Sequence, residues 1–208
     1  MALRPSYAEA TKTLLRERLL DAAEDLLRER AWTRISMADI ARRAGVSRQT
    51  LYNEIGSRGD FAQAYVLREA DIFLGAVEQA VMENLDDPHA ALSDAFDVFL
   101  GVASQDPLIR AIVSGDGSDG LLALFTTHGA PVLRHATDRL AQILATGWPQ
   151  VDIDGARPLA DCVVRLAISH AALPAGSSAV TVARISEIIG PYLDALLATT
   201  GDGAGASV

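Results

Sequence analysis

A helical period runs through almost all of this 208-residue chain. Between Thr11 and Arg30, apolar residues recur every three or four positions and charged residues fill the opposite positions, which is typical of a helix with one buried face. The same spacing predicts further helices at about 37–43, 48–54, 58 to the eighties, 88–104, 131–148, 159–173 and 180–199. No alternating pattern bounded by turn residues, which would indicate a strand, interrupts them. The sequence therefore predicts an all-α fold.

Composition narrows the class of protein. Half of the residues are hydrophobic, which is enough for a large buried core. No segment approaches the roughly 20 apolar residues of a membrane-spanning helix, and the N-terminus lacks the apolar run of a secretory signal. The single cysteine, Cys162, excludes an intramolecular disulfide and is interpreted as a buried apolar residue. These features predict a soluble, cytoplasmic protein.

Charge is distributed unevenly along the chain. Residues 1–60 carry 11 Lys and Arg against 9 Asp and Glu, whereas residues 61–208 carry 7 against 18. An acidic surface repels nucleic acid, while a mildly basic one can approach it. A nucleic-acid contact is therefore expected in the N-terminal quarter of the chain, if anywhere.

Two short predicted helices follow one another in that quarter. Ser36 and Asp39 have the spacing of a capping box that starts the first, and Gly45, which can adopt a positive φ, ends it. Ser47 is placed to cap the second helix. Because apolar residues on both helices would pack the pair at a steep angle, the two segments are expected to form a helix-turn-helix.

The exposed face of the second helix carries side chains of the kinds that read DNA bases. Arg48 can form two hydrogen bonds with guanine, while Gln49 and Asn53 suit adenine. Thr50 offers both a methyl and a hydroxyl group. Side chains suited to backbone phosphates are Ser36, Ser47, Tyr52 and Arg58. The alternative interpretation is a compact helical hairpin with a polar surface and no DNA partner.

The stretch ISMADIARRAGVSRQTLYNEIGSRGDF, together with the long helix before it, resembles the N-terminal domain of the TetR/AcrR family of transcriptional regulators. The resemblance covers about residues 14–66. The residues to which it assigns DNA contacts are Ser36, Arg48, Gln49, Thr50, Tyr52 and Arg58. It also implies a homodimeric repressor that binds a palindromic DNA operator and responds to a small ligand. We accordingly expect a DNA-binding domain at 1–57, a ligand-binding and dimerisation domain at 58–200, and a disordered tail at 201–208.

The larger domain offers candidates for the ligand pocket that the resemblance implies. They are mostly apolar, with two polar side chains that could orient a ligand: Phe73, Phe96, Phe99, Leu100, Ile112, Leu122, Phe125, Arg165 and His170. A pocket of this composition suits a lipophilic, fatty-acyl-like compound. The alternative is that these residues are ordinary core and that the regulator has no effector.

The last two predicted helices are too apolar for a solvent-exposed surface. The residues expected at a dimer interface are Val163, Leu166, Ile185, Ile188, Ile189, Tyr192 and Leu196. Two copies of each helix would form a four-helix bundle about a two-fold axis. Pro191, after Gly190, is expected to kink the last helix or to cost it hydrogen bonds.

An enzyme is the competing class of function. The sequence contains no nucleophile-elbow, phosphate-loop or dinucleotide-binding signature. Its four histidines are scattered, and only His128 and His135 could share a metal. We therefore expect no catalytic residues, no metal and no cofactor.

Overall fold

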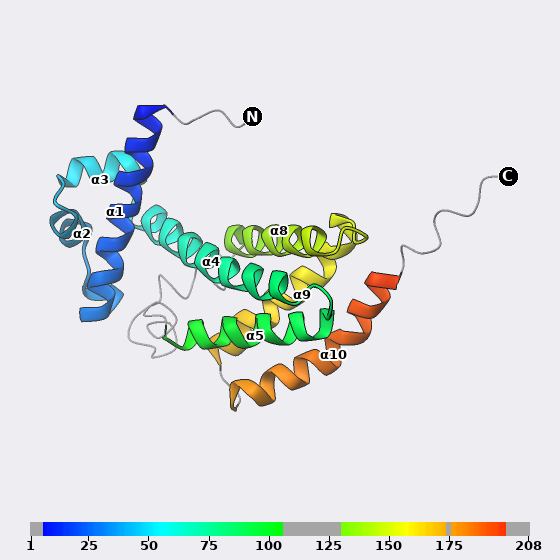
Figure 1. Ribbon diagram of the computed structural model, residues 1–208. Coiled ribbons are helices and arrows are strands. Elements are labelled where there is room, and N and C mark those ends of the chain that lie inside the picture. Colours follow the sequence, from blue (N-terminus) through cyan, green and yellow to red (C-terminus); the bar gives the residue numbers. More distant parts are fainter. Residues whose placement is uncertain (1–5, 106–129, 174–175, 199–208) are drawn as a thin grey trace.

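The computed structural model of the chain describes residues 6–105, 130–173 and 176–198. Over those residues its regular structure is entirely helical, which confirms the predicted all-α class (Figure 1). The helices, labelled as in Figure 1, are α1 (Tyr7–Glu29), α2 (Met37–Ala44), α3 (Arg48–Ile55), α4 (Arg58–Glu83), α5 (Pro88–Gln105), α8 (Ala130–Gly147), α9 (Ile153–Ala172) and α10 (Ser178–Ala198), with a 3-10 turn at Trp32–Arg34.

The first hydrophobic core joins α1, α2 and α3 to the beginning of α4. Leu19, Ile40 and Leu51 each contribute a fully buried side chain from one of the three N-terminal helices. Phe61 and Tyr65, near the start of α4, belong to the same core, and Val132 of α8 also packs into it. The N-terminal unit is therefore held together partly by the helix that leaves it.

The second core lies among α4, α5, α8, α9 and α10. In Figure 1, α4 runs from the N-terminal helices into this bundle, with α8 and α5 beside it. From Leu74 onward the buried residues of α4 belong to the second core, whereas those up to Val66 belong to the first. One continuous helix thus connects the two cores.

Side-chain caps set the starts of the N-terminal helices. In α2, Ser36 and Asp39 form the predicted capping box, because each side chain accepts from the other residue's backbone N–H. Ser47 Oγ accepts from the backbone N–H of Thr50 at 3.0 Å and caps α3 as expected. Gly45, at φ +69°, ends α2 in the left-handed conformation. These local signals explain why the helix-turn-helix could be predicted closely.

Three expectations were wrong. The sequence predicts a loop over 148–158, but α9 begins at Ile153, because Asp152 caps it, and the helix continues through Pro158 in its second turn. The first helix begins at Tyr7 rather than at about Thr11, since a further capping box precedes it. Cys162 is exposed on α9 instead of buried.

Replacing Gly45 with alanine is expected to destabilise the protein by about 1–2 kcal/mol, because a side chain disfavours the left-handed backbone. An added Cβ would lie 3.0 Å from Arg18 Nη2, the mobile end of a side chain, so the cost is mainly conformational. Urea unfolding measures the difference. Gly59→Ala is the control: it lies in the first turn of α4 with ordinary contacts and should be neutral or stabilising by about 0.5–1 kcal/mol. Equal stability of the two variants would contradict the argument.

Candidate DNA interface and effector pocket

Helix α3 presents a polar face to solvent. Arg48, Gln49 and Asn53 are exposed on it, while Leu51 anchors the opposite face in the core. Gln49 Nε2 donates a hydrogen bond to Asn53 Oδ1 at 2.7 Å, so these two candidate base-reading amides are held next to each other. The predicted recognition residues therefore share one accessible surface.

Thr50 and Ser47 are tied to one another at the start of α3. Their hydroxyl oxygens lie 2.7 Å apart, and Thr50 is only half-buried. Tyr52 is 42% exposed on the same short helix, with its ring available to a partner. Ser36 is also exposed, although its hydroxyl donates to Asp39 Oδ2 at 2.7 Å. Hydrogen bonds from the Ser36 side chain and backbone hold the pKa of Asp39 at about 2, so this capping carboxylate stays charged at neutral pH.

Arg58 has a different environment from the other candidates. Its guanidinium donates to the backbone carbonyls of Trp32, at 2.7 Å, and of Ile35. It also lies 4.4 Å from the centre of the Trp32 ring, and burial lowers its pKa. The phosphate contact expected of Arg58 stays a prediction, because in this structure the side chain fastens the start of α4 to the 3-10 turn.

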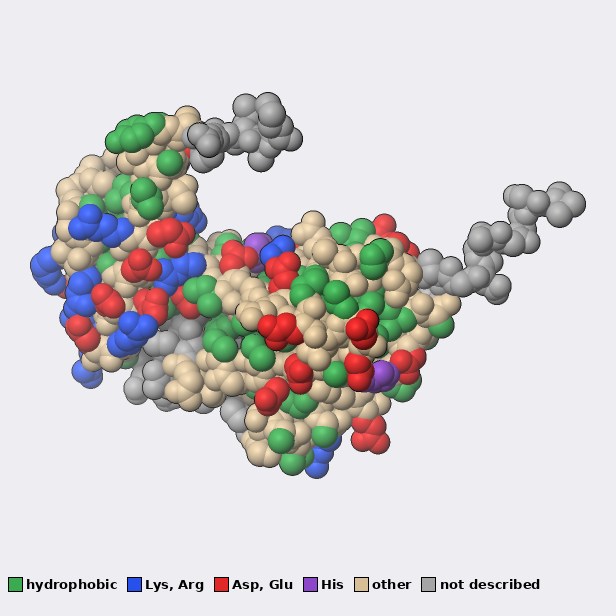
Figure 2. Space-filling model, in the orientation of Figure 1, with side chains coloured by type: hydrophobic (Ala, Val, Ile, Leu, Met, Phe, Trp, Pro, Cys, Tyr) green, Lys and Arg blue, Asp and Glu red, His purple; other side chains and the backbone are tan. Residues whose placement is uncertain are grey.

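The basic side chains around α3 differ in how they are engaged. Arg42 pairs with Asp39, and Arg43 pairs with Glu29 at 2.6 Å. Arg48 has no ion pair or hydrogen bond within the described ranges of the chain. On the face shown in Figure 2, most basic side chains lie over the N-terminal helices, interspersed with acidic ones, while the charged side chains of the body are mainly acidic. Arg48 is thus a cation left available on the candidate recognition helix.

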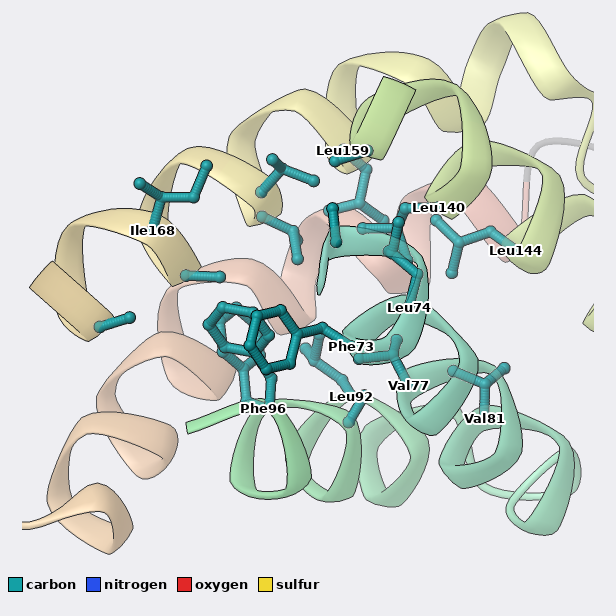
Figure 3. Close-up of a pocket in the computed structure, with 18 of the residues that line it drawn as sticks. Phe73, Leu74, Val77, Val81, Leu92, Phe96, Leu140, Leu144, Leu159 and Ile168 are labelled. Atoms are coloured by element: carbon teal, nitrogen blue, oxygen red, sulfur yellow. The ribbon is translucent and has the colours of Figure 1, made fainter. Parts of the chain in front are cut away.

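A cavity of about 290 Å³ lies inside the second core. Its lining follows α4 from Val66 to Val81, with further apolar side chains from α5, α8, α9 and α10 (Figure 3). Phe73 and Phe96 point into the same space in Figure 3, and Phe73 meets Phe99 edge-on with ring centres 5.5 Å apart. The cavity therefore forms an apolar channel alongside the helix that joins the two cores.

The predicted pocket residues divide into three groups. Phe73, Phe96 and Phe99 line the cavity. Leu100 packs against the second core without lining the cavity, and His170 is half-buried and also lies outside the lining. Arg165 is exposed and pairs with Asp161 at 2.8 Å. Three candidates fall outside the described residues: Ile112, Leu122 and Phe125.

Sequence reasoning missed one charged residue of the pocket. Glu69 lines the cavity although its residue exposure is only 5%. The spacing of Glu69 in the sequence could have indicated its burial, because it lies three positions after Val66 and four before Phe73 on the buried face of α4. A carboxylate inside an apolar stripe indicates a specific partner, which is Arg68.

The predicted dimer residues also occupy different environments. Ile188 is 74% exposed and Tyr192 is 48% exposed, so both are available to a second chain. Ile185 and Ile189 are buried in the chain's own core. The remaining three, Val163, Leu166 and Leu196, are partly buried against that core. Pro191 does not end α10, which continues through it.

Both parts of the chain match families of known proteins. Residues 19–65 match the family described as bacterial regulatory proteins, tetR family, and residues 87–191 match the C-terminal domain of bacterial tetracycline repressors. The chain belongs to the TetR family. Members of this family are transcriptional regulators that bind DNA and act as dimers, not enzymes. The recognised resemblance is thereby confirmed, and the protein is a TetR-family DNA-binding regulator.

Individual relatives agree with the TetR assignment. The HTH-type transcriptional regulator AlkX of Mycobacterium tuberculosis is 37% identical over 188 residues, covering 90% of this chain and 89% of that protein. A crystal structure is known for the TetR-family repressor AlkX from Dietzia sp. strain DQ12-45-1b, which is implicated in biodegradation of n-alkanes. Its sequence is 35% identical to this one, and the two structures match with a TM-score of 0.79 over 88% of this chain and 96% of that one. The putative transcriptional regulator SCO7518 of Streptomyces coelicolor A3(2) shares the fold. It is 22% identical and matches with a TM-score of 0.60 over 84% of this chain and 97% of that one.

Two kinds of feature are absent from the described residues. Within the described segments, no helix is both long and apolar enough to cross a membrane. Within the same segments, no group of three or more potential ligands is placed to hold a metal ion.

Proposed function

We propose that this protein is a repressor that binds a palindromic operator as a homodimer and leaves it when a long apolar molecule enters the second core. The observation that carries the proposal is the position of the cavity. It runs beside α4, and the same helix supplies Phe61 and Tyr65 to the core that supports the recognition helix. An effector that favours another placement of α4 would therefore change operator affinity.

The shape of the cavity favours an unbranched effector. Its lining extends along α4 from Val66 to Val81, which is about 22 Å at the rise of an α-helix. The cavity volume of about 290 Å³ is near the lower end of the range for ligand pockets. Spread over that length, it leaves only a narrow channel. The Dietzia repressor's link to n-alkane biodegradation supports a hydrocarbon chain or a product of its oxidation as the ligand.

The dimer is proposed to form through α9 and α10. Ile188 and Tyr192 lie one helical turn apart and expose large apolar surfaces on α10. Burying them against a second copy would place two α3 helices on one operator, each reading a half-site. We assign residues up to 57 to DNA recognition and the helices from Arg58 onward to effector binding and dimerisation.

Operator selection followed by release tests the proposal. The purified protein is used to select genomic fragments, and its affinity for a selected fragment is measured by fluorescence anisotropy with and without dodecane, primary dodecanol or dodecanoic acid. We expect a palindromic site, binding of a dimer, and weaker operator binding when one of these compounds is present. Tight binding of a compound with unchanged operator affinity would instead support an effector-independent regulator.

A further inference from the structure

The two cores meet at a charged pair in the middle of an otherwise apolar helix face. Val66 belongs to the first core and also lines the cavity, and Phe73 lies two turns further along α4 within the cavity. Arg68 and Glu69 lie between them. A ligand at the end of the channel nearest the DNA-binding helices would therefore lie beside this charged pair.

Glu69 is part of the almost wholly apolar cavity wall, and its carboxylate is bound by its neighbour Arg68. Among the described residues that line the cavity it is the one charged side chain. Its Oε1 accepts from Arg68 Nη2 at 2.9 Å and from Arg68 Nε at 3.2 Å. A buried carboxylate is stable only while such partners are kept, so its position is sensitive to what enters the cavity.

Arg68 links this carboxylate to the DNA-binding unit. Its Nη1 lies 2.6 Å from Asp21 Oδ1, and its Nη2 lies 2.9 Å from Glu24 Oε2, both on α1. The side chain is only 11% exposed and lies over the Tyr65 ring. Burial opposes the charge, but the hydrogen bond and charge of Glu69, with those of its other partners, raise the pKa of Arg68, so it remains a cation.

We propose that Arg68 is the positioning residue that transmits effector binding to the DNA-binding helices, and that Glu69 is the side chain the effector displaces. The Arg68 guanidinium binds the carboxylate of Glu69 in the cavity wall and those of Asp21 and Glu24 on α1. Moving Glu69 would therefore change how Arg68 holds α1 against α4. Because α1 packs directly on α2 and α3, this alters the placement of the recognition helix. The inference rests on the proposed release of the operator by an apolar effector.

Other ion pairs of α4 provide a matched comparison. His135 pairs with Asp71 at 2.6 Å, and Arg139 pairs with Glu78, which joins α4 to α8. Neither pair includes a residue of α1. Both pairs join α4 to α8 and do not reach α1, and the Arg139–Glu78 pair has the same arginine–carboxylate chemistry as the Arg68 cluster.

The test removes the α1 side of the cluster and leaves the cavity and α3 intact. In the double variant Asp21→Asn, Glu24→Gln, the dissociation constant of the best-binding probe among dodecane, primary dodecanol and dodecanoic acid is measured by Trp148 fluorescence. Operator affinity is measured with and without that probe. We expect probe binding within about two-fold of wild type, while the probe-induced loss of operator affinity, typically about 5- to 150-fold in allosteric proteins, falls towards unity.

The control is Glu78→Gln, which should keep the wild-type response to the probe. Arg68→Lys, which retains the charge but not the fork of donors, should give an intermediate response. A double variant that still releases the operator as wild type does would overturn the role of Arg68. If wild-type protein binds the probe without releasing the operator, or binds none of the probes, the proposed function itself fails and this inference fails with it.

Discussion

Replacing Arg48 with alanine is expected to abolish most specific operator binding while leaving the fold intact. Arg48 is exposed at the start of α3 and engages no other group in the described structure. A bidentate arginine–guanine contact contributes about 1–3 kcal/mol of discrimination, and a dimer loses two such contacts, so affinity should fall by roughly 30-fold to more than 10,000-fold. Fluorescence anisotropy with the selected operator measures the loss.

Two further variants show whether the effect of Arg48 is local and specific. Arg165→Ala removes another exposed arginine, on α9, and should leave operator affinity within a few-fold of wild type. Arg48→Lys keeps the charge but not the paired donors, so it should retain non-specific binding and lose discrimination between operator and random DNA. Wild-type affinity in Arg48→Ala would remove this residue from the recognition surface.

Effector affinity is expected to rise steeply with the length of an unbranched chain. Each buried methylene contributes about 0.8 kcal/mol, or roughly four-fold in the dissociation constant, so primary dodecanol should bind roughly 200-fold more tightly than primary octanol. The increase should end when the chain exceeds the channel, which lies along about 22 Å of α4. The change in tryptophan fluorescence on ligand binding gives the dissociation constants, because Trp148 lines the cavity.

Branching provides the control for this length series. A branched isomer of dodecanol has the same composition and nearly the same hydrophobicity, but it is too wide for a narrow channel and should bind at least ten-fold more weakly. Ala136→Phe, a change in the cavity wall contributed by α8, should shorten the longest chain that binds. Affinity that is independent of chain length, or equal for both isomers, would contradict an extended ligand.

The helix-turn-helix could be predicted because its determinants are local. Ser36, Gly45 and Ser47 act within a few residues of their own positions, and the structure uses all three as caps. The start of α9 could not be predicted in the same way. There, the Asp152 cap starts a helix even though the glycine and the proline that follow it indicate a loop in the sequence.

The pocket was only partly predictable, for a reason that depends on tertiary packing. Phe73 and Phe96 belong to the apolar periods of α4 and α5 and are both buried, so their contribution could be predicted from the spacing. Helices α9 and α10 are apolar on several sides, and the sequence does not show which side meets the cavity, the core or a partner. Leu159 and Ile168 line the cavity, whereas Ile188 faces outward, and only the packed bundle separates these roles.

A helix that belongs to two cores limits how this protein can be divided or recombined. A fragment ending at residue 57 would lack Phe61 and Tyr65 and would expose side chains of the first core such as Trp32, whose ring stacks on that of Phe61. A transplantable DNA-binding module must therefore extend at least through Leu67, which packs against that first core. A chimera that joins the DNA-binding helices of one relative to the effector-binding helices of another would have its junction within α4. The apolar spacing of α4 would have to be kept across that junction, because the same helix packs against both cores.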